Sequence, residues 1–79
     1  TGQAVLRIAL RGFEPADTIV AKLARALDAD VALLSARIDE IGGSHVGAMI
    51  IGVPVTAGAR AQSFLAGQGI EAEHLGHVA

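Results

Sequence analysis

The sequence predicts an α+β fold in which two helices cover one face of a four-stranded antiparallel sheet. Apolar residues recur with a period of two in four segments and with helical spacing in two others. These segments follow the order strand, helix, strand, strand, helix, strand, and short connections join them. The chain has 79 residues, enough for one domain only. Length, order and short connections together favour a ferredoxin-like (ACT-like) βαββαβ sandwich.

The first strand and the first helix are predicted from the change of hydrophobic period after residue 11. Residues 4–11 alternate, which predicts a half-buried strand with one apolar face. Gly12 and Pro15 bracket a turn, and Pro15 suits the first turn of the helix that follows. The apolar face of the strand consists of Ala4, Leu6, Ile8 and Leu10, and the apolar stripe of the helix consists of Ile19, Val20, Leu23, Ala24 and Leu27.

A hairpin is predicted in the middle of the chain. The period of two returns from Val31 to Ile41, and Gly42-Gly43-Ser44 then breaks the pattern as a hairpin loop does. The residues expected on one face of this strand are Ala32, Leu34, Ala36 and Ile38, with Ser35, Arg37 and Asp39 on the other.

The next strand, residues 46–55, is apolar on both faces. Val46, Ala48 and Ile50 alternate with Met49, Ile51 and Val53. A strand with two apolar faces is usually central in its sheet and covered on both sides. After it, Thr56 is expected to cap a second helix that buries Ala61, Phe64 and Leu65 and ends at Gly67 and Gly69, and residues 70–77 form the last strand.

The doubly apolar strand leads us to expect a homodimer. Two helices on one side of the sheet cover only one of its faces, so the other face needs a second cover. We expect Met49, Ile51 and Val53 to lie on that open face, where exposed apolar side chains would form an interface. The sequence therefore predicts a homodimer, packed through the open face or along an edge of the sheet, with these three residues at the interface.

The composition excludes several classes of function. Without cysteine the chain has no disulfide framework and no thiolate metal site. Six basic and eight acidic residues give a net charge of -2 with no run of one sign, so a nucleic-acid partner is not expected. No apolar stretch approaches the roughly 20 residues that span a bilayer, so direct membrane insertion is not expected. Because the sequence begins at Thr1, we expect a piece of a longer chain.

The three histidines do not predict a metal site. His74 and His77 have the spacing H-x-x-H, but on a strand an offset of three places the two rings on opposite faces. His45 follows the hairpin glycines, where we expect a solvated loop residue. No metal ion and no cofactor are therefore expected.

Catalysis finds no support in the sequence either. The carboxylates of Asp39 and Glu40 diverge on a strand, and neither Ser35 nor Ser63 lies in a nucleophile motif such as G-x-S-x-G. Gly42-Gly43 lies between two strands and so presents no helix N-terminus to a phosphate. The segment is not expected to be an enzyme.

The central and final segments of the chain resemble a known family. Residues 31–39, followed by Ile41-Gly42-Gly43 and Val46-Gly47, resemble the signature of the NIL domain, and so do residues 70–78. That domain is found at the C-terminus of the ATP-binding subunit of bacterial methionine-import ABC transporters. The likeness covers residues 3–78, which implies a single NIL-type regulatory domain at the C-terminal end of a longer ATPase subunit.

The resemblance also implies a ligand site. The family takes its name from an Asn-Ile-Leu triplet at the start of the second strand, and the matching positions here are Ala32, Leu33 and Leu34. In the family this triplet lies at the methionine site, near the interface between two copies. Ala32 replaces the Asn, which removes an amide able to bind the charged end of the ligand, a contact worth about 1 to 3 kcal/mol.

The function that the resemblance implies is allosteric. L-methionine would bind the domain and inhibit import from the cytoplasmic side, at the inner face of the cell membrane, with the permease subunits as partners of the parent chain. The segment contains no G-x-x-x-x-G-K-[ST] loop, so the ATP chemistry would lie upstream. Two alternatives remain: a dimerisation module that has lost its ligand, which Ala32 motivates, and an ACT-like sensor of another amino acid.

Overall fold

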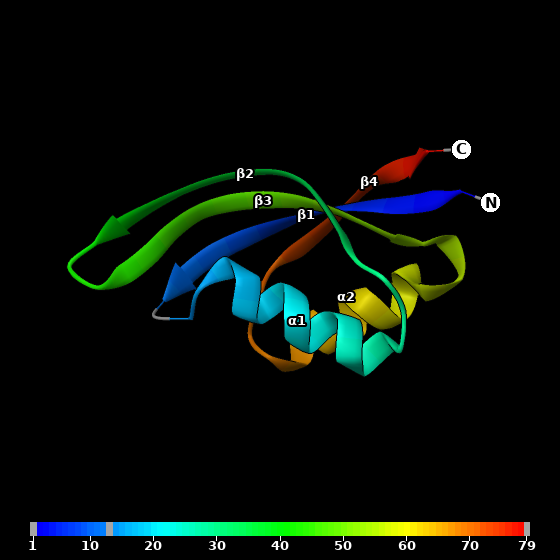
Figure 1. The fold of residues 1–79 in the computed structure, drawn as a ribbon, viewed down its shortest axis with the longest axis horizontal. Helices are drawn as coiled ribbons and strands as arrows, with labels where there is room; N and C mark the ends of the chain where they lie inside the picture. Colours follow the sequence, from blue (N-terminus) through cyan, green and yellow to red (C-terminus); the bar gives the residue numbers. More distant parts are fainter. Residues whose placement is uncertain (1, 13, 79) are drawn as a thin grey trace.

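Two α-helices pack against one face of a four-stranded antiparallel sheet in residues 2–12 and 14–78, the part of the chain that the computed structural model describes (Figure 1). Thr1, the first residue of the expected fragment, lies outside these described residues. The strand order is β2-β3-β1-β4. The predicted βαββαβ fold is therefore confirmed. Its elements are β1 (Gln3–Gly12), α1 (Ala16–Leu27), β2 (Ala32–Ile41), β3 (Ser44–Pro54), a 3₁₀ turn η1 (Val55–Ala57), α2 (Gly58–Gly67) and β4 (Ala72–Val78).

The core lies between the helices and the two central strands, β1 and β3. The predicted apolar face of β1 is confirmed, because its alternate residues are at most 3% exposed. Apolar side chains fill this layer, so its stability comes from apolar area removed from water. The buried residues are Ala4, Leu6, Ile8 and Leu10 of β1, Met49, Ile51 and Val53 of β3, Ile19, Leu23 and Leu27 of α1, Ala57 of η1, and Ala61 and Leu65 of α2.

The helix boundaries follow local chemistry, with one difference from expectation. Pro15, in an extended conformation, precedes α1, and Asp28 ends it in the left-handed conformation with φ 51°. Thr56 was expected to cap the second helix, but this is wrong. It lies inside η1, whose tighter turn leads directly into α2, and the amide of Gly58 donates to the carbonyl of Val55.

Met49, Ile51 and Val53 do not lie on the open face of the sheet, so the expectation that they form a dimer interface there is wrong. All three are 0% exposed within a single chain. They lie opposite Ile8, Leu6 and Ala4 in the β1–β3 register, on the face that the helices cover. The period of two separates the two faces of β3 but does not tell which face meets the helices. The apolar residues that β3 turns to the open face are Val46, Ala48 and Ile50.

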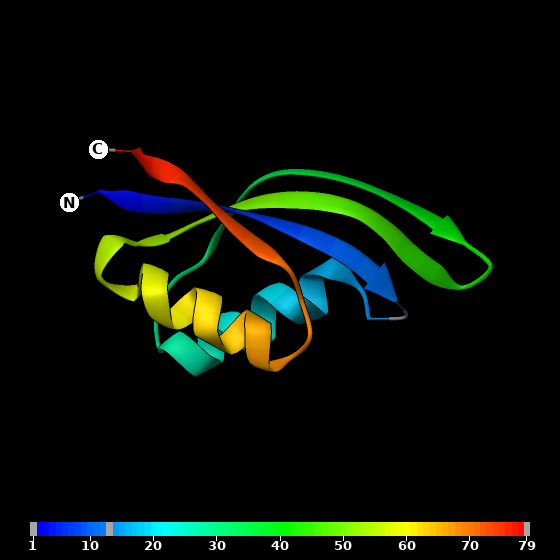
Figure 2. The same ribbon diagram turned by 180° about the vertical axis from the view of Figure 1, so that it is seen from behind.

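The outer strand β2 and the hairpin that joins it to β3 extend beyond the helices (Figures 1 and 2). The hairpin turns at Gly42 and Gly43, both with positive φ. At the opposite end of the sheet the two termini lie close together, where Gln3 of β1 pairs with Val78 of β4. The helices thus support the centre of the sheet and leave one of its long edges uncovered.

Two matched valines of β3 test this placement. Val53→Ala leaves a cavity in the core and lowers the free energy of unfolding by about 2 kcal/mol or more. Val46→Ala, at a position that is 41% exposed, lowers it by less than about 1 kcal/mol. Urea unfolding followed by circular dichroism measures both values. Equal losses would contradict the assignment of the two faces.

Candidate ligand and partner site at the outer strand

The residues predicted to bind the ligand, Ala32, Leu33 and Leu34, lie at the start of the outer strand β2. Leu33 lies opposite Ile51, and Ser35 lies opposite the adjacent residue Ile50, so Leu34 is one residue more than the partner strand has. Such a β-bulge bends its strand and re-aims the side chains on either side of it. The candidate triplet therefore lies at a bulge on the edge of the sheet.

The bulge overturns the expected alternation of β2. Ala32 was expected to share a face with Leu34, Ala36 and Ile38, and this is wrong. Ala32 lies opposite Gly52, on the open face of the sheet. Leu33 lies opposite the core residue Ile51, on the side of the helices. The triplet thus presents side chains on both sides of the sheet edge.

Two adjacent leucines of this edge remain half exposed. Leu33 is 54% exposed and Leu34 is 50% exposed. Leu33 faces the same side as the helices, so its exposure means that the helices do not reach across β2. Edge strands are usually protected by charge or proline, yet the positions from Ala32 to Ala36 carry neither. Apolar side chains beside outward-facing backbone amides and carbonyls suit a small amphipathic ligand or the edge of another sheet.

A second bulge lies in the opposite outer strand, β4, and it corrects the expectation for the histidines. Leu6 lies opposite His74 and Val5 opposite Gly76, which leaves Leu75 as the extra residue. His74 and His77 consequently meet edge to face, with ring centroids 4.8 Å apart. The expectation that their rings lie on opposite faces is wrong, because it assumed a regular strand.

The structure adds little chemistry elsewhere. His45 lies in β3 and not in a loop, with its side chain 21% exposed and its Nε2 3.8 Å from a carboxylate oxygen of Glu40. Among the described residues, no group of three or more His, Cys, Asp or Glu side chains is placed to hold a metal ion. Within the same residues, no helix is long and apolar enough to cross a membrane.

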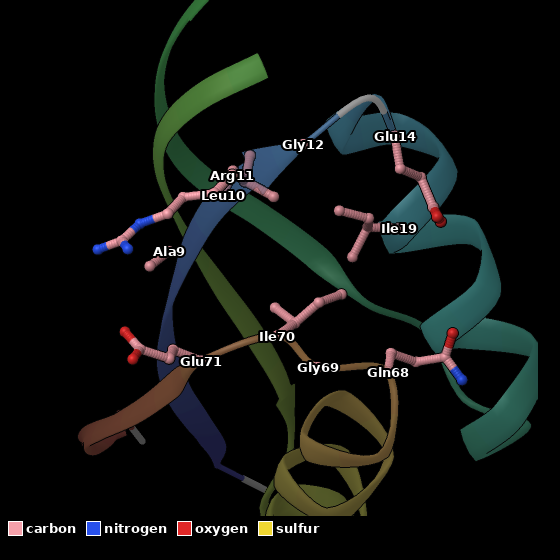
Figure 3. Close-up of a pocket in the computed structure, with 10 residues that line it drawn as sticks. All are labelled: Ala9, Leu10, Arg11, Gly12, Glu14, Ile19, Gln68, Gly69, Ile70 and Glu71. Carbon is pink, nitrogen blue, oxygen red and sulfur yellow. The ribbon is translucent and has the colours of Figure 1, made fainter. Parts of the chain in front are cut away.

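A pocket that sequence reasoning missed lies at the far end of β1. Its volume is about 460 Å³. Figure 3 shows Ile19 and Ile70 extending towards each other inside it, whereas the charged ends of Arg11 and Glu71 point away. Two regions distant in the sequence, residues 9–19 and 68–71, form this pocket, so no local pattern could have indicated it. Its described lining consists of Ala9, Leu10, Arg11, Gly12, Glu14, Ile19, Gln68, Gly69, Ile70 and Glu71.

The fold and the uncovered outer strand define a ferredoxin-like α+β domain whose candidate site is a sheet edge. The family model of the NIL domain matches residues 4–74. The chain belongs to the NIL domain family, and the resemblance noted in the sequence is confirmed.

Two curated relatives support the assignment. The chain is 54% identical over 80 residues to the methionine import ATP-binding protein MetN of Bradyrhizobium diazoefficiens, across 99% of this chain and 23% of the relative. It is 39% identical over 77 residues to the protein of the same name from Chromohalobacter salexigens, across 94% of this chain and 22% of the relative. The chain therefore spans less than a quarter of the length of these relatives.

A solved structure supports the fold. The crystal structure of the C-terminal domain of an ABC transporter/ATP-binding protein from Enterococcus faecalis superposes with a TM-score of 0.76. The match covers 92% of this chain and 83% of that chain at 17% sequence identity. At this identity the likeness shows the shared fold.

The exposure of the edge leucines gives a stability prediction. Leu33→Ala changes the free energy of unfolding of the single chain by less than about 1 kcal/mol, because half of the side chain is already in water. Leu23→Ala, at a fully buried position of α1, costs about 2 to 5 kcal/mol. Denaturant unfolding at low protein concentration measures both. A large loss at Leu33 would show that this side chain belongs to the core.

Proposed function

We propose that this chain is the regulatory domain of the ATP-binding subunit of a methionine importer, and that it binds L-methionine at the start of β2. One observation carries the proposal: Leu33 and Leu34 are half exposed on an outer strand that has no protecting charge beside them. Membership of the NIL family and the names of the two curated relatives support it.

The chemistry of the edge suits methionine. The thioether side chain of methionine is apolar, flexible and polarisable, and it adapts to irregular aliphatic surfaces such as the one Leu33 and Leu34 present. Each backbone amide and carbonyl that β2 turns outward can bind one of the charged groups of an amino acid. Burying such a ligand between a leucine surface and a second protein surface would remove the leucines from water.

The second surface is a second copy of this domain. In a homodimer with twofold symmetry the same edge is used by both chains, so each would cover the leucines of the other. Pairing along the rest of β2 also satisfies the outward-facing backbone groups that the ligand does not use. The dimer that the sequence predicted is retained here with a different interface, built from the edge at Leu33 and Leu34.

Regulation follows from linkage between ligand binding and domain arrangement. If methionine binds more tightly when the paired subunits hold their nucleotide domains apart, then a high methionine concentration slows import. A differential affinity of about 1 to 3 kcal/mol is sufficient for such coupling. In this role the domain acts on the cytoplasmic side of the membrane, through a parent chain that contacts the permease subunits.

Calorimetric titration with L-methionine tests the sensing role. We expect saturable binding with one site per chain, and weaker binding by Leu34→Asp, which places a charge in the apolar part of the site. The absence of binding heat at millimolar L-methionine would contradict the sensing role. The domain would then be a dimerisation module that has lost its ligand because Ala32 replaces the family's Asn.

A thermal-shift screen across the amino acids distinguishes a sensor of another ligand. A ligand at 100 times its dissociation constant stabilises the fold by about 2.7 kcal/mol. We expect L-methionine to give the largest rise in Tm. If a different amino acid gives a larger rise in Tm, that amino acid and not methionine is the ligand.

Sedimentation equilibrium tests the dimer. We expect Leu33→Asp to weaken dimerisation, because it buries a charge in the apolar interface. Leu75→Asp is the matched control, since Leu75 is a 47% exposed leucine at the bulge of the opposite outer strand. If Leu75→Asp dissociates the dimer and Leu33→Asp does not, the interface lies along β4.

A further inference from the structure

The side chain of Gln3 lies over a glycine of the neighbouring strand. A Cβ at Gly52 would be 2.7 Å from Oε1 of Gln3 and 3.1 Å from its Cδ. Gly52 is buried, and it is not among the glycines with positive φ, so its backbone does not require glycine. The absence of a side chain at Gly52 therefore makes room for the carboxamide of Gln3.

This carboxamide lies beside the candidate site. Ala32 is directly opposite Gly52 on the open face of the sheet. Cβ positions in such a pair are about 5 Å apart, and the Gln3 amide occupies the side of Gly52 on which a Cβ would lie. Ala32 adds only a methyl group on this face. The amide and Ala32 therefore share the open face, with Gly52 between their strands.

The carboxamide is also free to bind a ligand. Within the described part of the chain, the side-chain hydrogen bonds are those of Asp17 and Arg60, and Gln3 takes part in neither. A carboxamide provides two N–H donors and a carbonyl acceptor. Its nitrogen lies 3.5 Å from the position of a Gly52 Cβ, farther than its oxygen.

We infer that Gln3 supplies, from across β3, the amide that Ala32 does not provide, and that its Nε2 donates to the α-carboxylate of the bound amino acid. This inference rests on the proposed function, since it assigns the polar contact of the same site. Leu34, at the bulge, contacts the side chain of the ligand, and Gln3 binds its charged end on the open face that Ala32 shares. Affinity is then retained at a position where the family's asparagine is absent.

Titration with two ligands tests the inference. Gln3→Ala weakens binding of L-methionine about ten- to a hundredfold, the usual effect of losing a hydrogen bond to a charged group. It leaves the affinity for the methionine analogue that lacks the carboxylate unchanged. The control Gln68→Ala, at an exposed glutamine after α2, alters neither affinity.

Two further variants separate binding from folding. Gly52→Ala displaces the flexible end of Gln3 with little change in Tm, and it weakens L-methionine binding in the wild-type background but not in Gln3→Ala. Ala32→Asn added to Gln3→Ala restores affinity, because it returns an amide to the same region.

The outcomes distinguish this inference from the proposed function. If wild type binds L-methionine and Gln3→Ala binds it equally well, the role of Gln3 is overturned and the proposed function stands. Equal losses for the two ligands would identify a structural effect and also overturn the role of Gln3. If the wild-type protein binds no amino acid, both the role of Gln3 and the proposed function are overturned.

Discussion

The antiparallel pairing of β1 with β3 is the contact on which the rest of the structure depends. Its register places Ala4, Leu6 and Ile8 beside Val53, Ile51 and Met49, which creates a single apolar surface two strands wide. Both helices are used to cover that surface. In a chain of 79 residues little else is available, and β2 remains outside the covered area. The exposed edge is therefore a direct consequence of how the core is built.

One extra residue in each outer strand changes the face of the sheet on which neighbouring side chains lie. At Leu34 the bulge turns Ala32 to the open face while Leu33 stays on the side of the helices. At Leu75 a second bulge brings His74 and His77 into contact. Bulges of this kind interrupt regular pairing, so an edge can be apolar and still resist unlimited strand addition. An edge of this kind suits a defined partner or ligand better than open-ended association.

Small residues next to that edge have a role that burial alone does not reveal. Gly52 and Ala32 are neighbours on the open face, and together they place only one methyl group there. The carboxamide of Gln3 lies over Gly52 and comes from β1, at the end of the sheet where the termini lie. The carboxamide and Ala32 share the open face of the sheet, whereas Leu33 lies on the side of the helices.

The sequence by itself determined the elements, their order and the apolar face of β1, because hydrophobic period depends on local backbone geometry. The signature around β2 also indicated the family and the candidate triplet Ala32, Leu33 and Leu34. Only the tertiary structure decided which apolar face of β3 meets the helices, and the prediction for Met49, Ile51 and Val53 was wrong for that reason. It also decided the bulges at Leu34 and Leu75 and the position of Gln3 over Gly52. These features depend on the register between strands distant in sequence, and a shift of one residue there exchanges the faces of a strand without changing its hydrophobic pattern.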